Sequence, residues 1–335
     1  MDLWRPRVLV LGPGGVRGFC FLGFLCAICD AGLLEETDIF CGVSIGGLIS
    51  MLLVCGYKPR EIIKEGTGLD IFKNLEPLTL TNIISARGLV SNKTIEDNLR
   101  RLIVAKFGSV PTFAQLYDLT GKALICVTLN TTDETCQMMD PSVTPNLNIL
   151  DAVLRTINIP FLMQQLVQDG KTYVDGALAN PYPVDYFDDG NTNILGIYLK
   201  TVHNDTVSVS GMSVEGSISP RGGMDQTISE NTPNVSQHTG SILQNTTSVY
   251  LQKIFQSAMD QRRISIIQNC SVRVKHAPLE CVPRDALGIM TGIDAKGQML
   301  SEGYTYGQRW VEQLKSNQYV SPAVPKRPRY SYPPE

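Results

Sequence analysis

The stretch IFCGVSIGGLIS, residues 39–50, places Ser44 between Gly42 and Gly46, with an apolar run on each side. The short run before the serine is typical of a buried strand, and the longer run after it indicates a buried helix. A strand, a Gly-x-Ser-x-Gly turn and an apolar helix form the context of a nucleophile elbow, in which a strained turn presents the serine hydroxyl. The stretch therefore predicts an α/β fold and a candidate nucleophile, but it does not say which group takes the serine's proton.

A second glycine-rich junction lies upstream, where RVLVLG (7–12) reads as a strand and GPGGVRG opens an apolar helix. Strand and helix alternate here with glycines at the junctions, which predicts a mostly parallel sheet. The bared N–H groups of such a turn bind an anion, either a dinucleotide phosphate or the oxyanion of an acyl-transfer intermediate. The spacing departs from Gly-x-Gly-x-x-Gly because Arg17 takes the third glycine's place, and Asp38 stands near the expected ribose position.

Composition and charge exclude some classes of function. The chain has 335 residues, 43% hydrophobic and 18% charged, with a net charge of -3, which argues against a broad nucleic-acid surface. The nine cysteines include a single CxxC, Cys26 and Cys29, but form no paired metal-binding motif, so they are expected to be reduced and mostly buried, and no motif predicts a metal or a cofactor. The sequence shows no signal peptide, and its most apolar run suits a buried helix better than a membrane span. We therefore expect a soluble, cytoplasmic protein with no nucleic-acid partner.

The rest of the chain continues the alternation of strands and helices before its composition changes. Strands are expected at KTYVDG, NILGIYLK and SVRVKHAP, a hairpin at 122–140, and helices at 92–108, 149–160, 248–268 and 296–315. Residues 201–248 are rich in Ser, Thr, Asn, Gln and Gly and cannot supply much core, so we expect a long mobile insertion. The proline-rich segment 319–335 is expected to be a disordered tail, which leaves one domain over 6–318.

Two side chains are candidates for the base. Of the three histidines, only His276 lies outside the polar stretch, and it is either a triad member or an ordinary surface histidine. Asp175 ends the predicted strand KTYVD and is followed by Gly176, an arrangement that is also typical of a simple turn. Burial would raise the pKa of Asp175 above about 3.9, and direct contact with the serine hydroxyl would make it a usable base.

The three motifs GGVRG (14–18), GVSIG (42–46) and DGA (175–177) resemble, in order, those of the patatin-like phospholipase family. The likeness covers roughly residues 6–200 and 249–315. It implies a three-layer α/β/α fold with a mostly parallel central sheet, and a Ser-Asp dyad without histidine. Ser44 would be the nucleophile and Asp175 the base.

The resemblance also assigns the glycine loop. The amides of Gly14 and Gly15 would form the oxyanion hole, and Arg17 would orient the loop. Gly18, like the glycines of the other two motifs, completes the pattern. Pro13 departs from the family, which more often has a glycine there, and it offers no N–H, so the donors must begin at Gly14.

The implied activity is hydrolysis of ester bonds in membrane lipids through an acyl-enzyme. Two alternatives stay open. One is an acyltransferase on the same scaffold, and the other is a catalytically silent lipid-binding or interaction protein.

Overall fold

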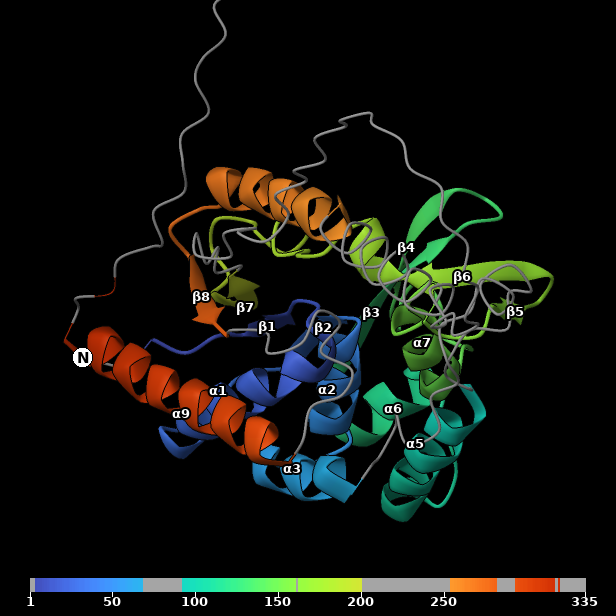
Figure 1. Cartoon of the computed structure of the whole chain (residues 1–335), viewed down its shortest axis with the longest axis horizontal. Coiled ribbons are helices and arrows are strands. Elements are labelled where there is room, and N and C mark those ends of the chain that lie inside the picture. Colours follow the sequence, from blue (N-terminus) through green and yellow to red (C-terminus); the bar gives the residue numbers. More distant parts are fainter. Residues whose placement is uncertain are drawn as a thin grey trace, which may run out of the picture.

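The computed structural model describes residues 4–68, 92–160, 162–200, 254–281, 293–316 and 319 (Figure 1). An eight-stranded sheet runs through the molecule in the order β5-β6-β3-β2-β1-β7-β8, with β4 paired to β3. The strands are β1 (Val8–Leu11), β2 (Ile39–Val43), β3 (Ala123–Asn130), β4 (Thr135–Met139), β5 (Leu166–Gln168), β6 (Lys171–Asp175), β7 (Ile194–Lys200) and β8 (Val274–Glu280).

Helices connect the strands. They are α1 (Gly18–Asp30), α2 (Ile45–Val54), α3 (Pro59–Gly68), α5 (Asn92–Phe107), α6 (Phe113–Thr120), α7 (Ile149–Thr156) and α9 (Ile293–Lys315), with the 3-10 turns η1 (Gly15–Arg17) and η2 (Gly176–Leu178). Residues 254–269 form a further helix. None of the helices in the described residues is long and apolar enough to cross a bilayer.

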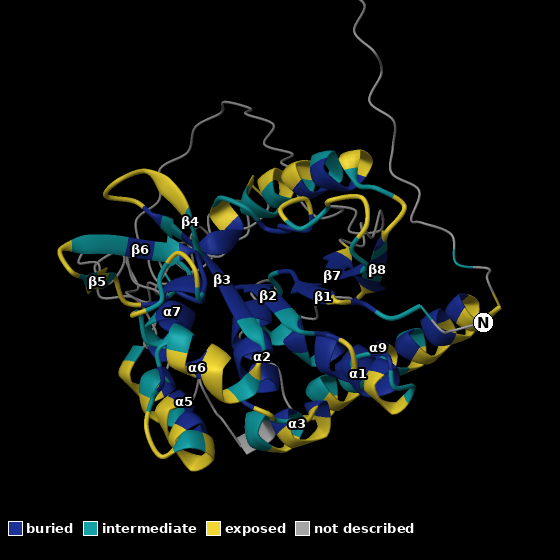
Figure 2. Ribbon diagram, turned by 180° about the vertical axis from the view of Figure 1, so that it is seen from behind, coloured by how far each residue is buried: buried dark blue, intermediate teal, exposed yellow. Residues whose placement is uncertain are grey.

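The sheet is covered on both faces, which confirms the predicted three layers. Successive strand residues point to opposite faces, so Leu9 and Leu11 join the core formed with α1, α2 and α9. Val8 and Val10 face the other side, where helix 254–269 packs. Figure 1 shows that helix (orange) across the sheet from α1, α2 and α9, and Figure 2 shows that the central strands are buried. Two hydrophobic clusters, one on each face, therefore hold the layers together.

The sheet is mostly parallel, as predicted. Strands β3, β2, β1, β7 and β8 run parallel to one another. Strands β4 and β6 each pair antiparallel with β3, and β5 pairs antiparallel with β6. Leu11 pairs with Gly42, so β1 and β2 end at the same edge of the sheet. The two glycine-rich junctions that follow them therefore lie side by side, where α/β folds bind ligands.

Strand β3 brings a third strand end to this place. Its residues 126–130 pair with β4 along one edge. On the opposite edge, Val127 pairs with Val43 of β2, and the next residue, Thr128, pairs with Asp175 of β6. Strands β2 and β6 therefore meet end to end along β3. The chain positions directly after Val43 and at the end of β6 are brought together by this register.

Most predicted elements are confirmed, including the hairpin β3–β4, the strands β6, β7 and β8, and the closing helix α9. None of the nine cysteines, all of which the structure describes, forms a disulfide, and six of them are buried. Helix α7 ends at Thr156 and does not continue up to Pro160 as expected. The reason is that Asn158 bonds to β6: its side-chain amide donates to the Tyr173 carbonyl, and its own carbonyl accepts from the Asp175 N–H. The insertion at 201–248 and the tail beyond Tyr319 lie outside the described residues.

Candidate active site

Ser44 stands at the turn between β2 and α2 with φ 58° and ψ -128°. A positive φ is uncommon for a non-glycine residue, and such a strained conformation costs about 1–3 kcal/mol. The Ser44 N–H donates to Thr156 Oγ1 at 3.0 Å, and its carbonyl accepts from Gly47 N–H at the start of α2. The side chain is only 4% exposed. This is the geometry that the Gly-x-Ser-x-Gly sequence predicted.

The glycines around Ser44 are required by close packing. A Cβ at Gly42 would lie 2.2 Å from the Gly46 carbonyl oxygen, and a Cβ at Gly46 would lie 2.3 Å from the Leu11 carbonyl oxygen. Backbone atoms on both sides cannot retreat from these contacts. The motif therefore allows α2 to start directly against the end of β1.

Asp175 ends β6 and its side chain is 4% exposed. Its carboxylate accepts a hydrogen bond from the Ala177 N–H at 2.8 Å and lies close enough to the side chain of Ser44 to interact with it. Burial raises the pKa of Asp175 to about 6, against the lowering effect of Ser44 and of the Ala177 N–H. Gly176 is needed because a Cβ there would lie 2.2 Å from the Val127 carbonyl oxygen. The structure thus brings the two predicted residues of the dyad into direct contact.

Two further residues hold the dyad in place, and the sequence did not single them out. Thr156 accepts the N–H of Ser44, and the Asn158 carbonyl accepts the N–H of Asp175 at 2.9 Å. Both are buried and both belong to the segment RTINIPF at the end of α7. That segment contributed to the family resemblance, but only the fold shows that it connects Ser44 to Asp175.

The glycine loop lies against the nucleophile elbow. Gly15 has φ +55°, and a Cβ at Gly14 would lie 2.7 Å from Leu199 Cδ1 and 3.6 Å from Ile45 Cγ2. Within the described part of the chain, no protein acceptor is found for the N–H of Gly14 or Gly15. Two backbone donors next to the serine are suited to bind a developing oxyanion.

Arg17 and Gly18 fix this loop. The Arg17 guanidinium lies beside the Gly14 carbonyl, with Nε 3.5 Å from the oxygen, and burial lowers its pKa. Gly18 begins α1, and a Cβ there would lie 2.6 Å from Ile45 Cγ1. Both residues take part in the packing of the loop.

His276 is not part of this site. It lies on β8, separated from β2 by β7 and β1, and its Nδ1 is 2.8 Å from the hydroxyl of Tyr182. Burial lowers the pKa of His276 to about 4. The surface alternative is wrong as well, because the residue is 2% exposed. His276 is a buried core residue whose ring is hydrogen-bonded to Tyr182.

Asp38 does not support the dinucleotide alternative. It precedes β2 and forms an ion pair with Arg7, which precedes β1. Both residues lie at the amino ends of these strands, whereas the glycine loop follows the carboxyl end of β1. Asp38 thus lies at the opposite edge of the sheet from the glycine loop, too far away to contact a ribose bound beside that loop.

Comparison with known proteins identifies the family of this chain. Residues 9–188, more than half of the chain, match the family model of the patatin-like phospholipases. The chain belongs to the patatin-like phospholipase family, as its motifs indicated.

The chain is similar to a probable lipid hydrolase of Invertebrate iridescent virus 6, with 29% identity over 184 residues, which are 53% of this chain and 62% of that protein. It is similar to an uncharacterised protein of Acanthamoeba polyphaga mimivirus, with 29% identity over 194 residues, 56% of this chain and 64% of that protein. Each match thus spans less than two thirds of the relative. Among solved structures, VipD from Legionella pneumophila aligns over 92% of this chain and 67% of its own, with 12% identity and a TM-score of 0.49.

Proposed function

We propose that this chain hydrolyses carboxylic ester bonds of membrane lipids with a Ser44–Asp175 dyad. One observation carries the proposal: a serine in a strained elbow lies beside a buried aspartate with which its side chain interacts, and the pKa of that aspartate is raised to about 6. A base with a pKa near the working pH transfers protons best. The membership of the chain in a lipid-hydrolysing family supports this chemistry.

In the first half-reaction, Ser44 Oγ attacks the ester carbonyl carbon while the Asp175 carboxylate takes the hydroxyl proton. The carbonyl oxygen becomes an oxyanion that accepts hydrogen bonds from the N–H groups of Gly14 and Gly15. When the intermediate collapses, Asp175 gives the proton to the departing alcohol and an acyl-serine remains. Water, deprotonated by Asp175, then attacks the acyl carbonyl, and Asp175 returns the proton to Ser44 Oγ as the bond to the acyl group breaks and the fatty acid leaves.

Apolar surface beside the dyad supports a lipid substrate. A small cavity of about 60 Å³ starts two residues after Asp175, between η2 and helix 254–269, and its lining includes Ala177, Leu178, Phe255 and Met259. Leu178 is 37% exposed and Ile254 47% exposed. Apolar side chains at this edge suit contact with an acyl chain and with a membrane surface, so we propose a membrane lipid as substrate and peripheral membrane contact.

The dyad is tested with Ser44→Ala and Asp175→Asn on phospholipid vesicles and on a small soluble ester. Each change should lower turnover by about 1,000-fold or more, since loss of a member of a nucleophile–base unit disables the whole unit. Ser50→Ala, within α2, and Asp169→Asn, in the turn between β5 and β6, serve as matched controls and should keep activity.

A fluorophosphonate probe separates the alternatives. The wild type should be labelled at Ser44 and should release free fatty acid. Labelling without free fatty acid, but with acyl transfer to an added alcohol, would identify an acyltransferase. Absence of both labelling and hydrolysis in a folded wild type would identify a silent lipid-binding protein. Full activity of Asp175→Asn would refute the dyad.

A further inference from the structure

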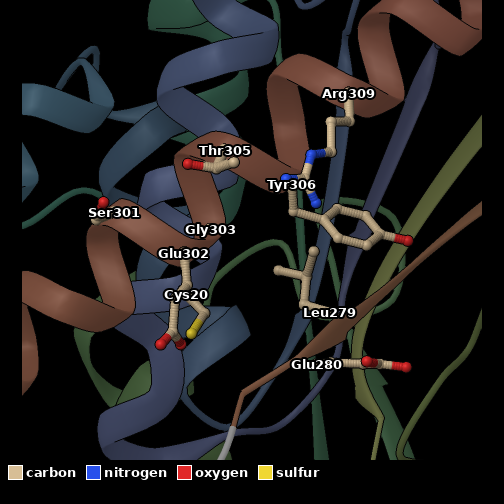
Figure 3. A pocket seen from close by; sticks show the side chains of 9 residues that line it. All are labelled: Cys20, Leu279, Glu280, Ser301, Glu302, Gly303, Thr305, Tyr306 and Arg309. Carbon is tan, nitrogen blue, oxygen red and sulfur yellow. The ribbon is translucent and has the colours of Figure 1, made fainter.

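Three metal-binding side chains converge beside the oxyanion loop. Cys20 lies in the first turn of α1, Cys281 directly follows β8, and Glu302 lies on α9. One ligand atom from each residue, two sulfurs and a carboxylate oxygen, lies within 4.8 Å of the others. Both thiols are 1% exposed, whereas Glu302 is exposed. In Figure 3 the side chains of Cys20 and Glu302 extend from their two helices toward each other.

Solvent reaches this cluster through a cavity. The cavity has a volume of about 380 Å³, and Cys20 and Glu302 line it together with Leu279, Tyr306 and Arg309 (Figure 3). An ion can therefore enter from the side of α9, and a water molecule can complete its coordination. Gln298 donates to Glu302 Oε1 at 2.9 Å, as hydrogen-bonded groups behind metal ligands commonly do.

We propose that Cys20, Cys281 and Glu302 bind a zinc ion. Zinc takes sulfur and carboxylate ligands in tetrahedral geometry, with bonds of about 2.3 Å to sulfur and about 2.0–2.2 Å to oxygen. Magnesium and calcium select oxygen ligands, so two cysteines exclude them in favour of a softer ion. Three protein ligands and one water give the coordination number that zinc prefers.

The charges around the cluster support a divalent ion. Two thiolates and one carboxylate carry three negative charges, and zinc offsets two of them. The Arg17 guanidinium interacts electrostatically with both cysteines and supplies the remaining positive charge. The site with zinc bound is therefore neutral as a whole, which limits the cost of keeping it partly buried.

The sequence predicted no metal site because the three ligands lie far apart in the chain and form no spacing motif. The fold brings them together, and tight packing fixes them. A Cβ at Gly303, next to Glu302, would lie 2.1 Å from the carbonyl oxygen of Cys20. Zinc would thus fasten the first turn of α1, which directly follows the oxyanion loop, to β8 and α9.

The site is tested on the full chain after dialysis against a chelator. Zinc added in slight excess and then desalted should remain at one ion per chain by elemental analysis. Cobalt should produce a thiolate-to-cobalt absorption band that zinc abolishes. Cys20→Ser should lose the band and the retained zinc, and Glu302→Gln should weaken zinc binding by 10-fold or more. Cys29→Ser on α1 and Glu312→Gln on α9 are the matched controls and should bind as the wild type does.

A measurement on the unaltered chain covers the case in which Cys20→Ser fails to fold. Bound zinc should slow alkylation of Cys20 and Cys281, read by peptide mass spectrometry, and leave that of Cys29 unchanged. Equal metal retention by the wild type and Glu302→Gln, with unprotected cysteines, would overturn the proposal. So would a wild type that binds no zinc and instead loses both thiols to a disulfide under peroxide.

Discussion

In the proposed mechanism, Asp175 acts as a base only while its carboxyl group is ionised. Because burial raises its pKa to about 6, we expect kcat/KM for a soluble ester to rise with pH through that value and then level off. The measurement is a pH–rate profile from about pH 4.5 to 8, with unfolding monitored at each pH. A rate that stays flat down to about pH 4.5 would contradict a base that titrates near pH 6.

The same raised pKa has a cost in stability. The folded state binds the Asp175 proton more tightly than the unfolded state, so this group's contribution to stability falls as the pH rises from the unfolded value of 3.8 through about 6. Asp175→Asn should therefore unfold at a higher urea concentration than the wild type at pH 8. The gain is about 3 kcal/mol at most, since one pKa unit corresponds to about 1.4 kcal/mol. Lower stability of the variant would contradict a desolvated carboxylate.

Gly15 can be tested against a matched glycine elsewhere. Gly15 and Gly170 have φ of +55° and +72°, and neither has an atom within 4 Å of a Cβ added to it. An alanine at either position should cost about 1 kcal/mol of stability, because only the backbone is strained. Only Gly15→Ala should also lower kcat, by up to about 100-fold, by displacing an oxyanion donor. Equal activity of the two variants would remove Gly15 from the oxyanion hole.

At the scale of elements, α7 supports the elbow between β2 and α2. Thr156, its last residue, accepts the N–H of Ser44. Thr156→Val keeps the shape and removes the acceptor, so we expect a loss of about 1–3 kcal/mol for the buried, unpaired N–H. Urea unfolding and kcat should both fall for Thr156→Val, and Thr156→Ser should restore both. A Val variant with wild-type kcat would mean that the elbow keeps its shape without α7.

The sequence could predict the elements whose signal is local. The glycines around Ser44 indicated the elbow, and alternating apolar runs indicated the sheet. The roles of Thr156 and Asn158 could not be predicted from residue types, because they depend on where α7 ends relative to β3 and β6. The contact between Ser44 and Asp175 depends in the same way on the register of β3. A resemblance to a family, not periodicity, was needed to select Asp175.

At the scale of the whole molecule, α1 and α9 cross so closely that their backbones touch. A Cβ at Gly303 would lie 2.1 Å from the Cys20 carbonyl oxygen, whereas Gly297, on the same helix, has nothing within 4 Å. Gly303→Ala should therefore destabilise the protein by about 1–3 kcal/mol or more, because the added methyl group overpacks against the backbone of α1. Gly297→Ala should stabilise it by about 0.5–1 kcal/mol through helix propensity. Thermal unfolding measures both, and equal effects would contradict the close crossing.

The pairing of α1 with α9 also determines at which point during synthesis the chain can become active. A ribosome makes α1 before, and α9 after, every other helix that the structure describes. A nascent chain that has reached residue 200 already carries both Ser44 and Asp175, yet the face of α1 that packs on α9 is still bare, and such apolar surface is what chaperones hold. The oxyanion loop at the start of α1 then lacks its support. We expect the growing polypeptide to be inert toward the lipids around it, and to gain the proposed activity only when α9 has left the exit tunnel.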